Sequence, residues 1–150
     1  MTEFAPSSNR PPSLSKSILA AEPIGAAPSS RILVVEDDFL ISLEIESTLA
    51  GAGFEVVVVG SGEEALNAAA ANRIDLVIMD VRLAGAMDGV EAATELFKAY
   101  GLRSVFATAH SDQHVRARAA AAQPLGWLVK PYSPASLLAA VQAALGGAGN

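Results

Sequence analysis

The sequence predicts an α/β fold in which a five-stranded parallel sheet carries five helices on its two faces. Between residues 31 and 145, short apolar runs alternate five times with segments of helical spacing. The runs are apolar throughout, which is typical of strands buried on both faces. Glycine, proline and serine fall at the boundaries, where turns and helix ends need them. Such alternation favours parallel strands joined by right-handed crossovers.

Five runs have the length and composition of β-strands. They cover residues 31–35, 54–59, 75–80, 104–107 and 126–129. The chain is organised around the run that ends at Asp80, because an uninterrupted apolar stretch stops there at a carboxylate. In an open parallel sheet, residues just past the carboxyl ends of strands line the ligand crevice. Asp80 is therefore a candidate functional residue, although this stretch alone equally permits a simple loop cap.

Five segments have apolar residues three or four positions apart, which predicts helices. They cover residues 39–50, 61–71, 90–100, 111–122 and 134–145. Ser61 and Glu64 have the spacing of a capping box, so a helix begins there. Gly101 is expected to end the third helix, and Ser133 followed by Pro134 is expected to open the last one.

Other polar residues are expected to have structural or surface roles. Asp38 is expected to cap the first helix rather than to bind a ligand, because Asp is preferred at helix starts. Ser111 and Asp112 are the expected cap of the fourth helix. Arg116 and Arg118 on that helix are expected to form a solvated face.

One folded domain is expected, covering residues 31–146, and 150 residues are enough for a sizeable core. Residues 1–30 hold five of the eight prolines and seven serines, with few large apolar side chains. They are therefore expected to be a disordered tail. Residues 147–150 are expected to be a frayed C-terminus.

The composition excludes several classes of function. The sequence has no cysteine, which excludes disulfides and thiolate sites. The formal net charge of −6 argues against non-specific binding to nucleic acid. No apolar run approaches the ~20 residues of a membrane span, and the N-terminus lacks the pattern of a signal peptide. We expect a cytoplasmic protein that binds neither nucleic acid nor membrane.

Polar side chains follow four of the five expected strands. They are Glu36, Asp37, Asp80, Thr108 and Lys130. Parallel strands place their carboxyl ends at one edge, and a strand order of 2-1-3-4-5 puts Asp37 beside Asp80. Neighbouring carboxylates repel unless a cation lies between them, and ligands that are all oxygen suit Mg²⁺. A magnesium site is therefore expected at this edge.

This set of groups is suited to phosphoryl transfer. A carboxylate such as Asp80 can act as the nucleophile, while a metal ion and Lys130 neutralise charge on the transferring oxygens. The expected product is an aspartyl phosphate at Asp80. Thr108 would then hydrogen-bond the phosphoryl oxygens.

The chain resembles the receiver domain of response regulators in two-component signalling, over roughly residues 31–145. The motifs that carry the resemblance are Ile-Leu-Val-Val-Glu36-Asp37, Val-Ile-Met-Asp80, Met87-Asp88-Gly89, Phe-Ala-Thr108-Ala109 and Leu-Val-Lys130-Pro131. Each motif is weak alone, but the ordered set is specific. The resemblance implies a flavodoxin-like fold, and we also expect a cis peptide between Lys130 and Pro131.

The resemblance also implies a role for each matching residue. Asp80 would be the phosphoacceptor and, with Lys130, the catalytic pair. The implied metal ligands are Asp37, Asp80, the backbone carbonyl of Arg82 and, through water, Glu36. Thr108 and Lys130 would bind the phosphoryl group. Thr108 and Trp127 would form the conformational switch.

The implied function is a single-domain response regulator. It would accept phosphate from a sensor histidine kinase or a histidine phosphotransfer protein, and would then signal through protein contacts or act as a phosphate sink. It would not be an enzyme in the ordinary sense. The alternatives are a Mg²⁺-dependent phosphohydrolase with an aspartyl-phosphate intermediate and a degenerate receiver that serves only as a scaffold. One departure is Ala84, where the family usually has proline, in a loop that looks one residue longer.

Overall fold

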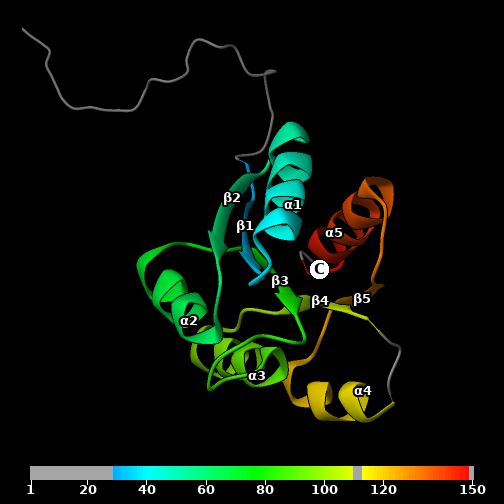
Figure 1. The fold of residues 1–150 in the computed structure, drawn as a ribbon. Coiled ribbons are helices and arrows are strands. Elements are labelled where there is room, and N and C mark those ends of the chain that lie inside the picture. The colour runs from blue at the N-terminus through cyan, green and yellow to red at the C-terminus, as the bar shows by residue number, and fades with distance from the viewer. Residues whose placement is uncertain (1–28, 110–112, 149–150) are drawn as a thin grey trace, which may run out of the picture.

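The computed structural model describes residues 29–109 and 113–148 (Figure 1). The strands are β1 (Arg31–Val35), β2 (Glu55–Val59), β3 (Leu76–Asp80), β4 (Ser104–Thr108) and β5 (Gly126–Val129). The helices are α1 (Phe39–Gly51), α2 (Gly62–Ala71), α3 (Gly89–Tyr100), α4 (Gln113–Ala119) with the 3₁₀ turn η2 (Ala120–Ala122), and α5 (Pro134–Ala148). The predicted alternation of strand and helix is confirmed.

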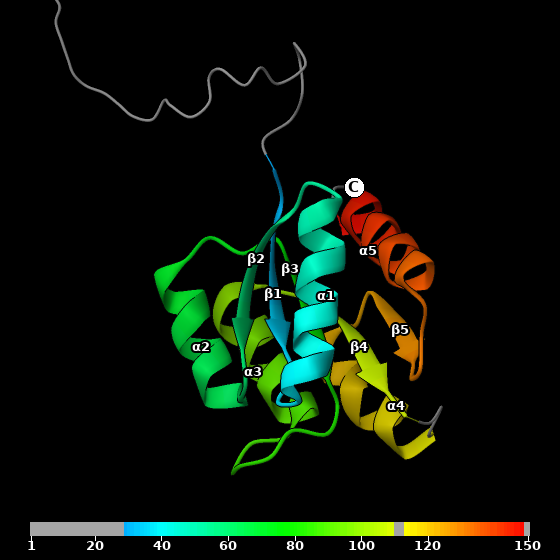
Figure 2. The ribbon, with the colours of Figure 1, turned by 45° about the horizontal axis from the view of Figure 1, so that its top comes forward.

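All the strands belong to one parallel sheet in the order β2-β1-β3-β4-β5. In Figure 2 the arrowheads of β1, β2, β4 and β5 point the same way. This is the predicted order, and β1 and β3 are neighbours, with Val35 opposite Met79. The residues that follow β1 and β3 therefore emerge side by side at one edge of the sheet.

The helices cover the sheet on both sides, with α1 and α5 on one face and α2, α3 and α4 on the other (Figure 1). Each face has its own apolar cluster because successive strand residues point to opposite sides. On the α1 and α5 side, Ile32, Val34 and Ile78 pack against the two helices. On the opposite side, Leu33 and Met79 pack against α2, α3 and α4.

The observed helix caps agree with the predicted ones at some positions and differ at others. Ser61 caps α2 by accepting from the Glu64 amide, but the Glu64 side chain accepts from the amide of Gly60, so the capping box predicted at Ser61 is only half formed. A complete box occurs instead at α3, between Asp88 and Glu91. Gly101 ends α3 in the left-handed conformation, as predicted.

The fourth and fifth helices differ from the prediction in their last turns. The fourth changes from α to 3₁₀ geometry over Ala120–Ala122, and its predicted cap at Ser111 and Asp112 lies outside the described residues. α5 continues to Ala148, past the expected domain end at residue 146, and residues 149 and 150 lie outside the described residues. Residues 1–28 of the predicted tail also lie outside the described residues.

β2 lies at one edge of the sheet and pairs only with β1 among the described strands. After Glu55 it consists of four consecutive valines, all half-buried. Val57 and Val59 pack against one apolar cluster, and Val56 and Val58 pack against the other. Within the described ranges, the structure contains no helix that is both long enough and apolar enough to cross a membrane.

Candidate functional site

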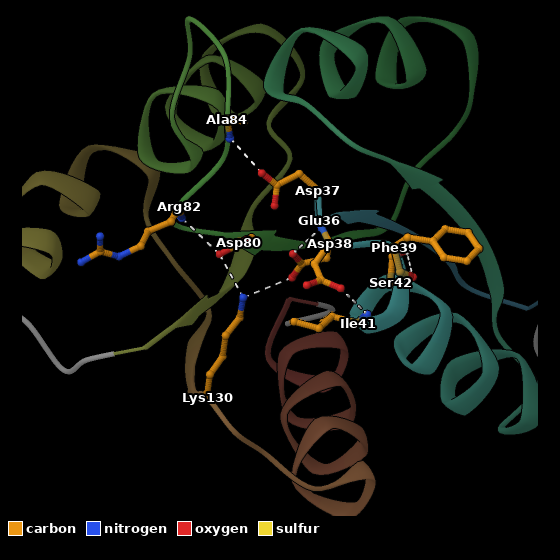
Figure 3. Close-up of polar contacts among 10 residues, drawn as sticks. All are labelled: Glu36, Asp37, Asp38, Phe39, Ile41, Ser42, Asp80, Arg82, Ala84 and Lys130. Atoms are coloured by element: carbon orange, nitrogen blue, oxygen red, sulfur yellow. Dashed lines mark hydrogen bonds and ion pairs between the residues drawn. The ribbon is translucent and has the colours of Figure 1, made fainter.

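Three carboxylates gather at the carboxyl edge of the sheet, where β1 and β3 end (Figure 3). One carboxylate oxygen from each of Glu36, Asp37 and Asp80 lies within 4.8 Å of the others. The side chains of Glu36 and Asp80 are 2% and 6% exposed, whereas Asp37 is exposed. The expected proximity of Asp37 and Asp80 therefore holds, and two of the three acids are shielded from solvent.

Lys130 reaches these acids from the end of β5 (Figure 3). Its Nζ lies 3.2 Å from Glu36 Oε1 and 3.3 Å from Asp80 Oδ1. Its backbone amide donates to the Thr108 carbonyl at 2.7 Å, which anchors it to the end of β4. The Lys130–Pro131 peptide is cis, as predicted. Burial alone would lower the pKa of Lys130, but the charges of Asp80 and Glu36 outweigh it and raise that pKa.

Glu36 is buried beside another carboxylate, and both conditions disfavour its charged form. Burial is the main cause that raises the pKa of Glu36 to about 7, and the neighbouring Asp80 charge adds to it. The Asp38 amide, which donates to Glu36 Oε2 at 3.0 Å, and the Lys130 charge both act in the opposite direction. The site therefore holds more negative charge than its single ammonium group offsets.

Each acid of the cluster accepts a hydrogen bond from a backbone amide. Asp38 donates to Glu36, and the amide of Arg82 donates to Asp80 Oδ1 at 3.1 Å. The amide of Ala84 donates to Asp37 Oδ2 at 3.0 Å. The Arg82 side chain itself points away from the cluster (Figure 3). These hydrogen bonds orient the three carboxylates.

The donor set fits a magnesium ion. The ligand atoms are carboxylate oxygens, and neither histidine nor cysteine belongs to the cluster. A divalent cation would offset both the mutual repulsion of the acids and the unfavourable burial of Glu36. Asp38 does not belong to the cluster, because its Oδ1 caps α1 by accepting from the Ile41 amide at 3.0 Å, as predicted.

The two residues of the predicted switch, Thr108 and Trp127, lie on the face of the sheet covered by α4. Thr108 is buried at the end of β4, directly after Ala107, which is opposite Asp80 in the sheet. Trp127 is opposite Phe106, and their rings stack with centroids 4.9 Å apart. Because Phe106 and Thr108 are two residues apart on one strand, Trp127 and Thr108 share this face.

Some contacts around the site were not predicted from the sequence. Arg116 and Arg118 are exposed, as expected, but the guanidinium of Arg116 also lies 4.5 Å from the centre of the Trp127 ring, a contact that was not predicted. Arg118 pairs with Asp88 at 2.9 Å, which connects α4 to the start of α3. The third contact is the hydrogen bond that the backbone amide of Ala84 donates to Asp37. Its one sign in the sequence was an alanine where the family usually has proline.

Comparison with known proteins agrees with this architecture. The protein family described as "Response regulator receiver domain" matches residues 32–142. The chain belongs to this family. Receiver domains are signalling domains of two-component systems, and the predicted resemblance and five-stranded fold are both confirmed.

Two curated relatives align with most of this chain. It is 36% identical over 121 residues to the transcriptional regulatory protein PdtaR of Mycobacterium tuberculosis, covering 80% of this chain and 58% of PdtaR. It is 35% identical over 115 residues to the DNA-binding response regulator MtrA of the same organism, covering 77% of this chain and 50% of MtrA. The chain thus spans about half the length of these curated relatives.

A solved structure supports the fold independently. The chemotaxis protein CheY4 of Vibrio cholerae has a TM-score of 0.75 and 30% sequence identity to this receiver. The match covers 79% of this chain and 100% of the CheY4 chain.

Proposed function

We propose that this receiver accepts a phosphoryl group on Asp80 from a phosphohistidine of a sensor histidine kinase or a histidine phosphotransfer protein. The observation that carries the proposal is a buried Asp80 carboxylate that faces an ammonium group within a cluster of acids at the carboxyl edge of the sheet. An isolated structural aspartate has no need of Lys130 and two further carboxylates around it. Nucleophilic phosphoryl transfer uses a carboxylate nucleophile, a positive charge beside the transferring oxygens and acids that can hold a metal ion.

In the proposed reaction, a carboxylate oxygen of Asp80 attacks the phosphorus of the phosphohistidine. An O–P bond forms, the P–N bond breaks, and the histidine nitrogen that leaves takes up a proton from solvent. Lys130, 3.3 Å from Asp80 Oδ1, holds positive charge beside the incoming phosphoryl oxygens. The hydroxyl of Thr108, on the neighbouring strand, is proposed to donate to the phosphoryl group after transfer.

Magnesium is the proposed cofactor. Asp37, Asp80 and the backbone carbonyl of Arg82 would hold it directly, and Glu36 would hold it through a water molecule. When bound, it supplies positive charge that neutralises the phosphoryl oxygens during transfer. The exposure of Asp37 leaves one side of the cluster open, which suits an ion that keeps some of its waters.

A protein partner is supported by the surface beside the site. At the start of α1, Phe39 and Leu40 are 72% and 71% exposed, and Leu43 is 48% exposed. A groove of about 930 Å³ continues from Leu40 between α1 and α5 to Lys130 and Tyr132. Large apolar side chains exposed next to a reactive carboxylate are typical of a docking site for the phosphate donor. Output is proposed to pass through protein contacts or to consist of draining phosphate from the donor.

The decisive test is phosphorylation of the whole chain by acetyl phosphate and by a phosphorylated kinase, followed by intact-mass measurement. The unaltered protein should gain one phosphoryl group, and Asp80→Asn should gain none, because an amide is not a nucleophile here. Asp38→Asn is the matched control, since it removes a neighbouring acid but keeps a good helix cap. Label on Asp80→Asn would place the acceptor elsewhere. Repeated turnover of a small phosphate ester would favour the phosphohydrolase alternative.

A further inference from the structure

The loop between β3 and α3 contacts the acidic cluster through the backbone of Ala84. The Ala84 amide donates to Asp37 Oδ2 at 3.0 Å across a sequence separation of 47 residues (Figure 3). The amides that serve Glu36 and Asp80 belong to residues only two positions further along the chain. Asp37 is therefore the acid whose backbone donor comes from a different segment.

We propose that the Ala84 amide is a positioning group, which fixes the carboxylate of Asp37 for Mg²⁺ and so sets the affinity of the site for this ion. The proposal rests on the function proposed above. It adds that the residue at position 84 tunes metal binding through its backbone rather than its side chain. The Ala84 side chain is exposed.

A hydrogen-bond donor that fixes the carboxylate matters more for Asp37 than for Glu36 and Asp80. Glu36 and Asp80 are held by their burial and by Lys130, which lies 3.2 Å and 3.3 Å from them. Asp37 is exposed, so in the absence of a partner its side chain would sample several rotamers, and binding a metal would require fixing one of them. A hydrogen bond to one carboxylate oxygen removes part of that cost in advance. Hydrogen-bonded partners of ligating carboxylates commonly affect metal affinity by about 10–100-fold.

The identity of residue 84 decides whether the bond can form. A proline has no backbone N–H, so it could not donate to Asp37. Among the described residues, Gln123 is the one non-glycine with a positive φ, so Ala84 already lies in the half of the backbone map that proline occupies. Replacing Ala84 by proline therefore removes the donor and keeps a compatible sign of φ.

The test compares Mg²⁺ binding to the full chain for Ala84→Pro and Ala84→Ser by isothermal titration calorimetry. Serine keeps the amide, so we expect Ala84→Pro to bind Mg²⁺ about tenfold more weakly than Ala84→Ser. Ala86→Pro is the matched control, because it adds the same ring to another exposed position of the loop while leaving the Ala84 amide in place. Equal affinities for Ala84→Pro and Ala84→Ser, or an equal loss in Ala86→Pro, would overturn the proposal.

A second measurement needs no metal. The melting temperatures of the unaltered chain, Ala84→Pro, Asp37→Ala and the double variant form a cycle that isolates the contact between the two residues. We expect Ala84→Pro to lower the melting temperature more in the presence of Asp37 than in the Asp37→Ala background. Additive changes would mean that the amide and the carboxylate do not interact, which overturns the proposal even if every variant folds.

The measurements distinguish an error in the role of the Ala84 amide from an error in the proposed function. If the unaltered protein binds Mg²⁺ and becomes phosphorylated, while the Ala84 variants bind alike, only the role of the amide is wrong. If the unaltered protein neither binds Mg²⁺ nor takes up phosphate, the proposed function is wrong, and the role of the amide in metal binding is wrong with it.

Discussion

Replacing Glu36 by glutamine should change how the stability of this receiver depends on pH. Burial raises the pKa of Glu36 from 4.5 to about 7 in the folded protein. Between these two values the folded state binds more protons than the unfolded state, so stability falls as pH rises from about 4.5 through about 7. Glutamine has nearly the same size and no charge, so Glu36→Gln removes this loss.

The magnitude follows from the size of the pKa change. A pKa raised from 4.5 to about 7 corresponds to at most about 3 kcal/mol of unfolding free energy. Lys130 is 24% exposed, so water reaches one side of the cluster and screens its charges. We therefore expect the unfolding free energy of Glu36→Gln to rise by about 1–2 kcal/mol relative to that of the unaltered protein as the pH increases from 5 to 8.

The assay is urea unfolding at several pH values in the presence of a chelator, with both proteins measured side by side. The same substitution at the exposed Glu46 on α1 is the control, and it should leave the pH dependence unchanged. If the curves of the unaltered protein and Glu36→Gln run parallel from pH 5 to pH 8, the reasoning about the buried acid is refuted. Millimolar Mg²⁺ should reduce the difference, because a bound cation offsets the charge of Glu36.

Further predictions concern the same site and its support. Mg²⁺ should raise the melting temperature and Asp37→Asn should abolish most of that gain in a thermal shift assay; equal values in chelator and in Mg²⁺ would contradict the metal site. Gly89→Ala should destabilise the protein by about 1–3 kcal/mol or more in chemical denaturation, because a Cβ there would overlap the carbonyl oxygen of the last β3 residue, whereas Gly51→Ala meets open space and should not. Beryllofluoride with Mg²⁺ should shift the fluorescence of Trp127, and the shift should be weaker in Thr108→Ala; identical responses would show that the two residues are not coupled.

The fold could be predicted from the sequence because its signals are local. An apolar run such as 31–35 identifies a buried strand, and alternation with helical segments fixes a parallel arrangement. The gathering of Asp37, Asp80 and Lys130 followed from that arrangement, since parallel strands end at one edge. The resemblance to a known family then supplied a role for each residue.

Other contacts could not be predicted because they depend on how separate segments lie against each other. Asp88 and Glu91 have the spacing of a capping box, but the clearer pattern at Ser61 drew the prediction to α2. The stacking of Arg116 on Trp127 requires the orientation of α4 over β5, which no spacing reveals. The Ala84 amide is a backbone group, so its bond to Asp37 leaves no pattern of residue types beyond the missing proline.

The four valines of β2 have a consequence for the behaviour of this chain in solution. The outer side of an edge strand presents backbone N–H and C=O groups that are ready to pair with another chain. Here the strand carries no charge after Glu55, and apolar side chains on both of its faces are covered only while α1 and α2 stay packed. A short, uncharged, β-branched segment of this kind favours pairing into intermolecular sheets once it is uncovered. Partial unfolding that releases either helix would therefore expose Val56–Val59 to pairing with other chains, so the helices that cover the sheet also protect this edge against aggregation.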